Sequence, residues 1–305
     1  MMEPVIRVNG EQADCCTGRA VLDWSKVLWN GTMLAGTLAA LFHVTLGAVV
    51  LFVALTYATL LIGHSVGMHR MMIHRSFKAK TWLRRLLIYV GTIVGVAGPF
   101  GIIRIHDTRD WAQRQPVCHD FFNHDRPLLQ DLVWNLFYRF DFARAPIVTI
   151  EPELADDPLI NWLDATWRFQ QIPVALLLFW VGGWPFVLWG IFARVFVSTA
   201  GHWTITWFCH NPGPGRWHVT GAGVQASNLP GLGWLTYGEC WHNNHHAFPE
   251  SAKIGLEKGQ TDPAWWLIER LQKAGWVFAV RLPREENERG DLFERSHHVE
   301  GKVFD

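Results

Sequence analysis

The chain has 305 residues, half of them hydrophobic and only 18% charged, and its 27 basic side chains balance 27 acidic ones. A soluble domain usually carries about 25% charged residues, so this composition excludes a disordered chain and a coiled coil, and the zero net charge excludes a broad basic surface for nucleic acid. Five cysteines without a repeated spacing exclude a disulfide scaffold and a cysteine-based zinc module, whereas the 15 histidines are an excess that needs an explanation.

The first long apolar stretch predicts a membrane hairpin. The 43 residues from Val27 to His69 include no Asp, Glu, Lys or Arg. As one helix they would be roughly 65 Å long, which is about two crossings of a ~30 Å hydrocarbon core. We expect transmembrane helices at 27–44 and 47–68, with a turn near 43–47.

A second apolar stretch follows at 172–199 and is interrupted by Gly182-Gly183-Trp184-Pro185. Such Gly/Pro clusters mark turns, so we expect a second hairpin with helices at 160–182 and 185–207. A third uncharged run at 86–103 has histidine motifs near both of its ends. If those motifs share one site they lie on one side of the membrane, so we expect an interfacial or re-entrant helix there and not a fifth span.

Basic residues predict the orientation. Six Lys and Arg residues lie between 70 and 85, directly after the first hairpin, and the two hairpin turns contain none. Because basic residues concentrate on the cytoplasmic side, the histidine motifs should face the cytoplasm. The predicted class is an all-α integral membrane protein with four transmembrane helices under a helical cytoplasmic cap. It forms one domain, 1–305, divided into a hairpin (27–68), a first cap segment (69–158), a second hairpin (159–207), and a second cap segment with a tail (208–305). That last segment should include a helix near 263–275 and a charged tail near 284–295.

Two histidine motifs have the spacing of metal ligands. His242, His245 and His246 lie at i, i+3 and i+4, on one face of a helix, and imidazole suits iron, zinc, copper and nickel. His69 and His74 are five residues apart, about 140° on a straight helix, so both can ligate only if the helix ends or bends between them. Interfacial histidines in a basic patch remain the alternative for this pair.

Two further positions are less complete. The segment from 106 to 110 reads His106-Asp107-Thr108-Arg109-Asp110 and keeps the i, i+3, i+4 spacing with only one histidine. His202 lies near the end of the predicted fourth helix, on one face with Ser198 and Arg194, and an arginine within a membrane helix usually marks a functional cavity. We expect His119, His124, His210 and His218 to be surface or supporting groups, and His297 and His298 to be solvated in the tail.

The order of these motifs resembles that of the integral-membrane fatty-acid desaturases of the stearoyl-CoA type, in their shorter bacterial form. The resemblance rests on three phrases: Gly67-Met-His-Arg70, His74-Arg-Ser-Phe77 and Gly238-Glu-Cys-Trp-His-Asn-Asn-His-His-Ala-Phe-Pro249. It implies an acyl tunnel and a centre of two irons held almost wholly by histidine. It also implies insertion of a double bond into a saturated acyl chain, with O2 as co-substrate. The ligands it implies are His69, His74, His106, His202, His242, His245 and His246.

The middle motif departs from the family pattern, which has histidines at positions 109 and 110. Asp110 is a further candidate ligand, because carboxylate binds iron, whereas Arg109 has no lone pair to offer. Where the family has an Asn that holds a metal-bound water, this chain has Ser198. The second iron is therefore expected to be held weakly, held with other ligands, or absent. The side chains that could replace or orient ligands are His64, Asp107, Arg109, His119, Ser198, Asn243 and Asn244, with Glu239 as a further orienting group.

The resemblance leaves three functions open: desaturation of an acyl-CoA or acyl-lipid, hydroxylation or another lipid oxidation on the same scaffold, and a non-enzymatic lipid-binding relative with an incomplete metal site. The electrons would come from a separate donor of ferredoxin, rubredoxin or cytochrome type with its reductase. The expected partners are a fatty acyl substrate and the lipid bilayer, and no nucleic acid. The expected location is a bacterial inner membrane. Arginines available to a substrate headgroup are Arg70, Arg75, Arg104 and Arg114.

Overall fold

The structure is a computed structural model that describes residues 7–283 and 290–295. The described chain is mostly helical, and its strands form four two-stranded antiparallel pairs that the all-α prediction did not include. His297, His298 and residues 284–289 of the predicted charged tail lie outside the described residues. The helices are α1 (Trp24–Ala40), α2 (Leu46–Ala58), η1 (Thr59–Ile73), α3 (Thr81–Ile93), α4 (Pro99–Gln113), α5 (Asp120–Asn123), α6 (Leu128–Phe137), α7 (Pro152–Ala155), α8 (Pro158–Thr166), α9 (Gln171–Val187), η2 (Leu188–Ala193), α10 (Arg194–His210), α11 (His242–Ala247) and α12 (Pro263–Lys273).

The strands connect segments that are distant in the sequence. The pairs are β1 (Val8–Asn9) with β5 (Ile147–Val148), β2 (Asp14–Leu22) with β4 (Tyr138–Arg144), β3 (Lys78–Ala79) with β7 (Val277–Phe278), and β6 (Trp217–Val219) with β8 (Leu292–Glu294). The first two pairs attach the segment that precedes α1 to the region between α6 and α7. The strands β1 and β2 are therefore part of the folded body of the protein.

The first predicted hairpin is present as two helices joined by a turn at 41–45. Thr45 begins α2 by accepting a hydrogen bond from the amide of Ala48 at 3.2 Å, an N-terminal cap that satisfies one of the free donors there. The second arm is longer than predicted, because α2 continues without a break into the wide helix η1 and ends only at Ile73.

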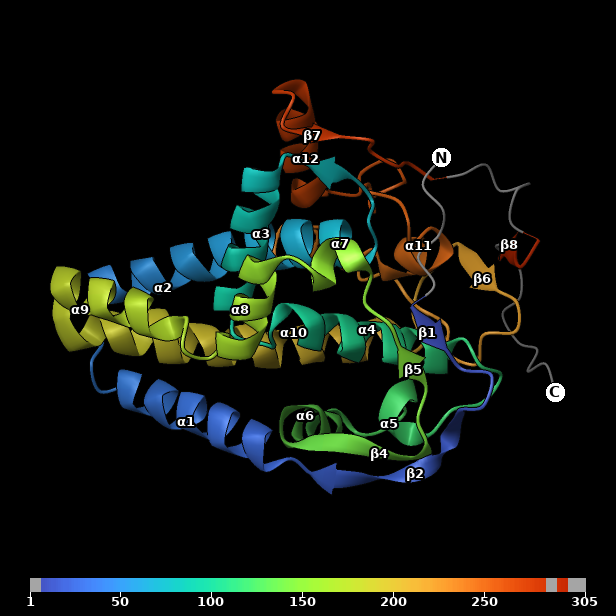
Figure 1. Ribbon diagram of the computed structural model, residues 1–305, viewed down its shortest axis with the longest axis horizontal. Coiled ribbons are helices and arrows are strands. Elements are labelled where there is room, and N and C mark those ends of the chain that lie inside the picture. Colours follow the sequence, from blue (N-terminus) through green and yellow to red (C-terminus); the bar gives the residue numbers. More distant parts are fainter. Residues whose placement is uncertain (1–6, 284–289, 296–305) are drawn as a thin grey trace.

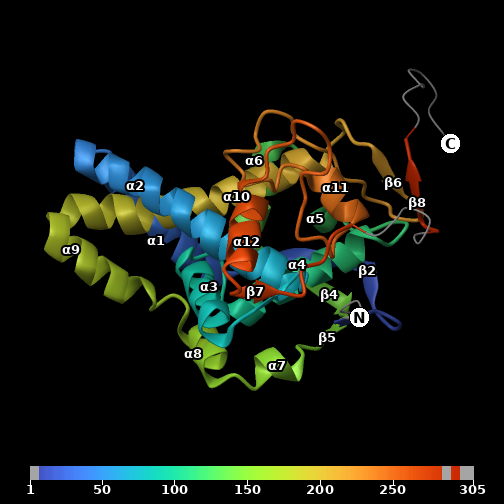
Figure 2. The same ribbon diagram turned by 90° about the horizontal axis from the view of Figure 1, so that it is seen from above.

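The second hairpin also turns where predicted. Gly183 has φ 64° and ψ −156°, a conformation open to glycine and not to other residues. At this point the chain folds back, so that the end of α9, η2 and α10 return beside its first part (Figure 2). The prediction of one helix over 160–182 was wrong, since α8 ends at Thr166 and turn residues at 167–170 separate it from α9.

The third uncharged run is not one helix. It consists of the second half of α3, a break at 94–98 and the start of α4. Gly95 has φ +88°, and Pro99 occupies the first turn of α4, where its missing amide hydrogen costs nothing. In Figure 1, α3 and α8 cross the direction of α2 and α10 steeply.

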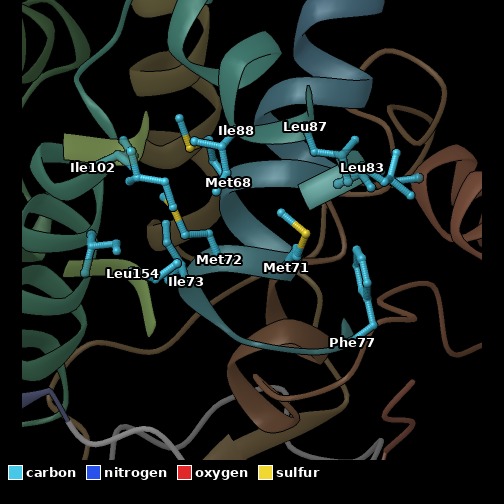
Figure 3. Packing of buried hydrophobic residues seen from close by; sticks show 14 of the residues in the cluster. Met68, Met71, Met72, Ile73, Phe77, Leu83, Leu87, Ile88, Ile102 and Leu154 are labelled. Carbon is cyan, nitrogen blue, oxygen red and sulfur yellow. The ribbon is translucent and has the colours of Figure 1, made fainter. Parts of the chain in front are cut away.

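Two helical segments, Leu46–Ile73 and Gln171–His210, are long and apolar enough to cross a membrane, the second of them with the reversal at Gly183 inside it. In the ribbon they run side by side with α1 (Figures 1 and 2). The main hydrophobic core lies at one end of these helices, where Met68, Met71 and Met72 of η1 pack against Leu87 of α3 (Figure 3). This core fixes the end of η1, and with it the first histidine motif.

Candidate metal centre

Seven histidines converge in two groups. One group consists of His69, His74, His106 and His245, and the other of His210, His242 and His246. Within each group the nitrogens that could ligate a metal lie within 4.8 Å of one another. Four separate elements (η1, α4, α10 and α11) supply them, so the tertiary fold brings the groups together.

The wide geometry of η1 brings His69 and His74 together. The amide of His74 donates to the carbonyl of His69 at 3.0 Å, an i→i+5 bond that places the two side chains on the same side. Nε2 of His74 lies 3.1 Å from Nε2 of His69 and 3.2 Å from Nε2 of His106. Two neutral imidazoles with facing nitrogens can form one hydrogen bond, in which one nitrogen donates and the other accepts. Three facing nitrogens cannot all be paired in this way, whereas a cation between them can accept a lone pair from each.

Carboxylates fix the far side of two of these rings. Nδ1 of His69 donates to Glu239 at 2.7 Å, and Nδ1 of His106 lies 3.0 Å from Asp107. A hydrogen bond at Nδ1 leaves the lone pair on Nε2 and orients it, the usual support of a metal-bound histidine. Asp107 and Glu239, expected to orient ligands, are therefore placed to do so.

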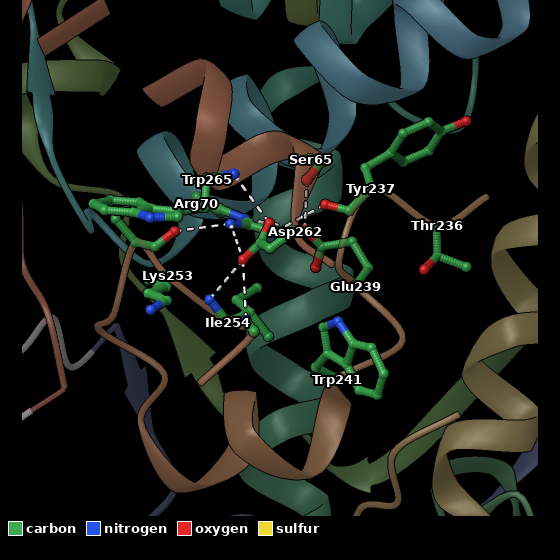
Figure 4. Close-up of polar contacts among 12 residues, drawn as sticks. Ser65, Arg70, Thr236, Tyr237, Glu239, Trp241, Lys253, Ile254, Asp262 and Trp265 are labelled. Atoms are coloured by element: carbon green, nitrogen blue, oxygen red, sulfur yellow. Dashed lines mark hydrogen bonds and ion pairs between the residues drawn. The ribbon is translucent and has the colours of Figure 1, made fainter. Parts of the chain in front are cut away.

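Glu239 is itself held by a buried ionic network (Figure 4). Arg70, 1% exposed, contacts Glu239 at 3.1 Å and Asp262 at 2.9 Å. Asp262 in turn accepts from the amides of Ile254 at 2.9 Å and Trp265 at 3.0 Å, which joins η1 to the loop before α12 and to its first turn. The network leaves Arg70 no donor for a substrate headgroup.

His210 completes the second group. Its Nδ1 donates to the carbonyl of Thr206 at 2.8 Å, so Nε2 carries the lone pair, and this buried atom has no hydrogen-bond partner. The ring centre lies 4.8 Å from that of His242 and 5.2 Å from that of His246, whose Nε2 atoms are 3.1 Å apart. The buried Nε2 of His210 thus has no hydrogen-bond partner and lies near the rings of His242 and His246, an arrangement in which a metal ion could bind all three nitrogens.

Electrostatics favours uncharged rings in both groups. Burial lowers the pKa values of His74, His242 and His245 well below their usual range, and it lowers the pKa of His246 to about 4. Neutral imidazole is the form that binds metals. Burial raises the pKa of Asp110, but Arg114, His246 and His106 outweigh it and hold that pKa below its usual range, so a carboxylate lies near the second group.

Comparison with known proteins gives one consistent result. The model of the fatty acid desaturase family matches residues 26–279. An sn-2 palmitoyl-lipid 9-desaturase of Nostoc sp. (strain 36) is 32% identical over 83% of this chain and 88% of its own length. An sn-1 stearoyl-lipid 9-desaturase of Anabaena variabilis is 33% identical over 72% and 79%, and an acyl-CoA 5-desaturase of Anemone leveillei is 29% identical over 93% and 89%. This chain belongs to the fatty acid desaturase family.

The desaturase is a membrane oxidoreductase of lipid metabolism that removes two hydrogens from a saturated acyl chain. Its family uses iron, and the donor set fits that use, because imidazole and carboxylate are ordinary iron ligands. The residues that would hold the metals are the seven clustered histidines.

Arg109 points away from both groups in the desaturase. It donates to Nε2 of His124 and, at 2.9 Å, to Asn135, and its guanidinium lies 4.4 Å from the ring centre of Trp203. His124 uses its other nitrogen on Asp131 at 3.0 Å and stacks on His210 at 5.1 Å. Because both nitrogens of His124 are hydrogen-bonded, His124 cannot bind a metal. Its ring packs against the ring of His210 instead.

The remaining predicted site residues lie outside the two groups. His202 packs against His64 at 4.9 Å between ring centres, and Ser198 is buried with an unpartnered hydroxyl. His119 caps α5, where its Nδ1 accepts from Phe121. Asn243 and Asn244 fasten α11 by bonding to the backbone at Trp217, Ala226 and Ile254. These two asparagines position the helix and not the individual rings.

Three of the four headgroup arginines already have acidic partners. Arg70 is buried as described, Arg75 lies 3.9 Å from Glu153, and Arg114 lies 3.3 Å from Asp110. Arg104 is exposed, and within 7–283 and 290–295 it forms no ion pair. His210 was expected to be a surface or supporting group, and its only signal as a ligand was its position at the end of the same apolar helix as His202.

Proposed function

We propose that this desaturase uses two irons and O2 to introduce a double bond into an acyl chain that is esterified in a membrane lipid. The convergence of seven histidines into two groups carries the proposal. His69, His74, His106 and His245 would hold one iron, and His210, His242 and His246 the other, with Asp110 beside it. His202 is then a packing partner of His64.

The reaction balances with one separate donor. Reduction of O2 to two waters takes four electrons and four protons. The acyl chain supplies two of each as the two hydrogens that it loses, the donor supplies the other two electrons, and the solvent supplies the other two protons. When bound, iron supplies the activation of O2 that an unactivated C–H bond requires. Glu239 and Asp107 orient Nε2 of His69 and His106. A ferredoxin, rubredoxin or cytochrome with its reductase is the donor we propose.

An acyl-lipid substrate fits the charges better than acyl-CoA. A CoA headgroup needs free cations, and three of the four candidate arginines are committed to Glu239, Glu153 and Asp110. The two cyanobacterial relatives are named as acyl-lipid enzymes, which agrees with this choice.

The proposed membrane arrangement has four spanning helices in one domain. Leu46–Ile73 and the part of Gln171–His210 that follows Gly183 would each cross the bilayer, and α1 and the part of α9 before Gly183 would cross it as the other arms of the two hairpins. The excess of basic residues between 70 and 85 supports a cytoplasmic position for the metal groups, and the membrane we propose is a bacterial inner membrane.

Expression in a host that lacks unsaturated acyl chains, followed by mass spectrometry of intact lipids and of acyl-CoA, tests the function. The expected products are lipids lighter by two hydrogens, absent with His74→Ala. Products heavier by one oxygen would show hydroxylation, and unchanged lipids with no bound iron would show a lipid-binding protein. Unsaturation that appears first in acyl-CoA would contradict the acyl-lipid substrate.

A further inference from the structure

Arg7 is buried at the N-terminal edge of the described chain, before the region that matches the desaturase family. Only 5% of the residue is exposed. Its Nε and Nη2 donate to the two carboxylate oxygens of Glu151 at 2.7 and 2.8 Å. Arginine is well suited to such paired contacts, because its donors form a rigid fork.

The other contacts of Arg7 lead to the first histidine group. Nη1 donates to the carbonyl of Ile73 at 2.8 Å and Nη2 to that of Met72 at 2.9 Å, so the guanidinium binds the end of η1 between His69 and His74. Nη1 also contacts Oδ2 of Asp107 at 3.0 Å. The other oxygen of Asp107 lies 3.0 Å from Nδ1 of His106. One guanidinium therefore contacts the supports of three of the four ligands.

The backbone around Arg7 is held independently of these contacts. Its carbonyl accepts from the amide of Thr149 at 2.9 Å. The next residues, Val8 and Asn9, pair with Val148 and Ile147 in the β1–β5 ladder. The strand pair thus presents the side chain at a fixed place.

A merely structural ion pair would need only Glu151. The contacts to Met72, Ile73 and Asp107 go beyond such a pair, since each removes freedom from an element that carries a ligand. We propose that Arg7 is a positioning residue of the first group, an inference that rests on the proposed metal ligands. The N-terminal segment, which lies outside the family match, would then complete the metal centre.

Cobalt(II) binding to the full-length protein in lipid nanodiscs, after removal of metal by chelation, tests the role of Arg7. We expect the wild type to bind two Co(II), and Arg7→Gln to weaken one of them by about 10- to 100-fold, the range for lost supports of metal ligands. Arg19→Gln is the matched control, because Arg19 lies on β2 of the same N-terminal segment with 79% of its side chain exposed. Equal binding in Arg7→Gln and the wild type would overturn the proposal, as would equal weakening of both positions.

Two further variants show which histidine group is affected and distinguish a loss of metal affinity from a failure to fold. In an Asp107→Asn background, Arg7→Gln should add less than it does alone, because the part of its effect that passes through Asp107 to His106 is already lost and only its bonds to Met72 and Ile73 remain to be removed. Arg7→Lys keeps the charge without the fork and should fold, yet lose affinity at the same position; unchanged affinity would count against the proposal. Lipid analysis of iron-loaded wild type reports the desaturase function separately. Absent products with an intact cobalt pattern would refute the function and leave the role of Arg7 standing.

Discussion

Oε2 of Glu239 lies 2.7 Å from Nδ1 of His69, which links the last histidine motif to the first across 170 residues of chain. The same carboxylate accepts from Arg70 and Ser65 through its other oxygen. The contact couples the position of the cap to the end of a membrane helix.

We predict that Glu239→Gln reduces metal affinity of the first group by about 10- to 100-fold, since the amide no longer holds the Nδ1 hydrogen of His69 as a carboxylate does. Metal content per chain, measured by elemental analysis after dialysis, checks this. Glu11→Gln, at an exposed position, should keep the wild-type content. Equal metal content in the two variants would show that Glu239 has only a packing role.

His210 and His202 give opposite predictions although they share α10. His210→Ala should remove one of two metals, because the second group loses the only ligand that α10 gives it. His202→Ala should keep both, because His202 packs on His64 outside the groups. Iron counts on both proteins decide between them. The reverse result would restore the ligand set that the sequence resemblance implied.

Asp110 should contribute to the second metal. Its carboxylate stays ionised because the effect of burial is opposed by the attraction of Arg114, 3.3 Å away, and its pKa lies below the usual range. Asp110→Asn should therefore lower occupancy of the second position and spare the first. Asp120→Asn, on the nearby helix α5, serves as the control. If the second metal position of Asp110→Asn were fully occupied, Asp110 would not be a ligand and its role would be limited to the ion pair with Arg114.

Arg109→His should not add a ligand. Position 109 points toward His124 and Asn135, so a histidine there would leave both without their donor. We expect no gain in metal and a loss of stability of about 1–3 kcal/mol, the cost of leaving a buried partner unpaired. Thermal unfolding and metal analysis check both points, with Arg104→His on the exposed face of α4 for comparison. A rise in metal content would contradict this geometry.

The sequence predicted what depends on local pattern. The absence of charge over 27–69 and the glycines at 182–183 located both hairpin turns, and the spacing at 242, 245 and 246 pointed to histidines that do lie in the two clusters. Even so, the motif divides: His245 joins the first group while His242 and His246 join the second. Which group a ring joins depends on how α11 sits between α10 and η1, and no local pattern records that.

Other features were hidden from the sequence for the same reason. His210 had no neighbouring histidine, so only the fold, which brings α11 beside the end of α10, could reveal it. The resemblance drew attention to His202, eight residues earlier on the same helix. Arg7 gave no signal, because its acceptors lie at 72, 73, 107 and 151. One helix was expected over 160–182 because the segment is apolar throughout, but apolar composition does not show whether a helix is interrupted.

A centre built almost entirely from neutral imidazoles has a consequence for metal choice. Nitrogen ligands bind divalent zinc and copper more tightly than ferrous iron. The protein therefore cannot select iron by affinity, and the supply of metals during folding decides which ion occupies the two groups. Protein produced in zinc-rich medium would be folded, fully loaded and inactive, so the metal content of a preparation has to be known before its activity is judged.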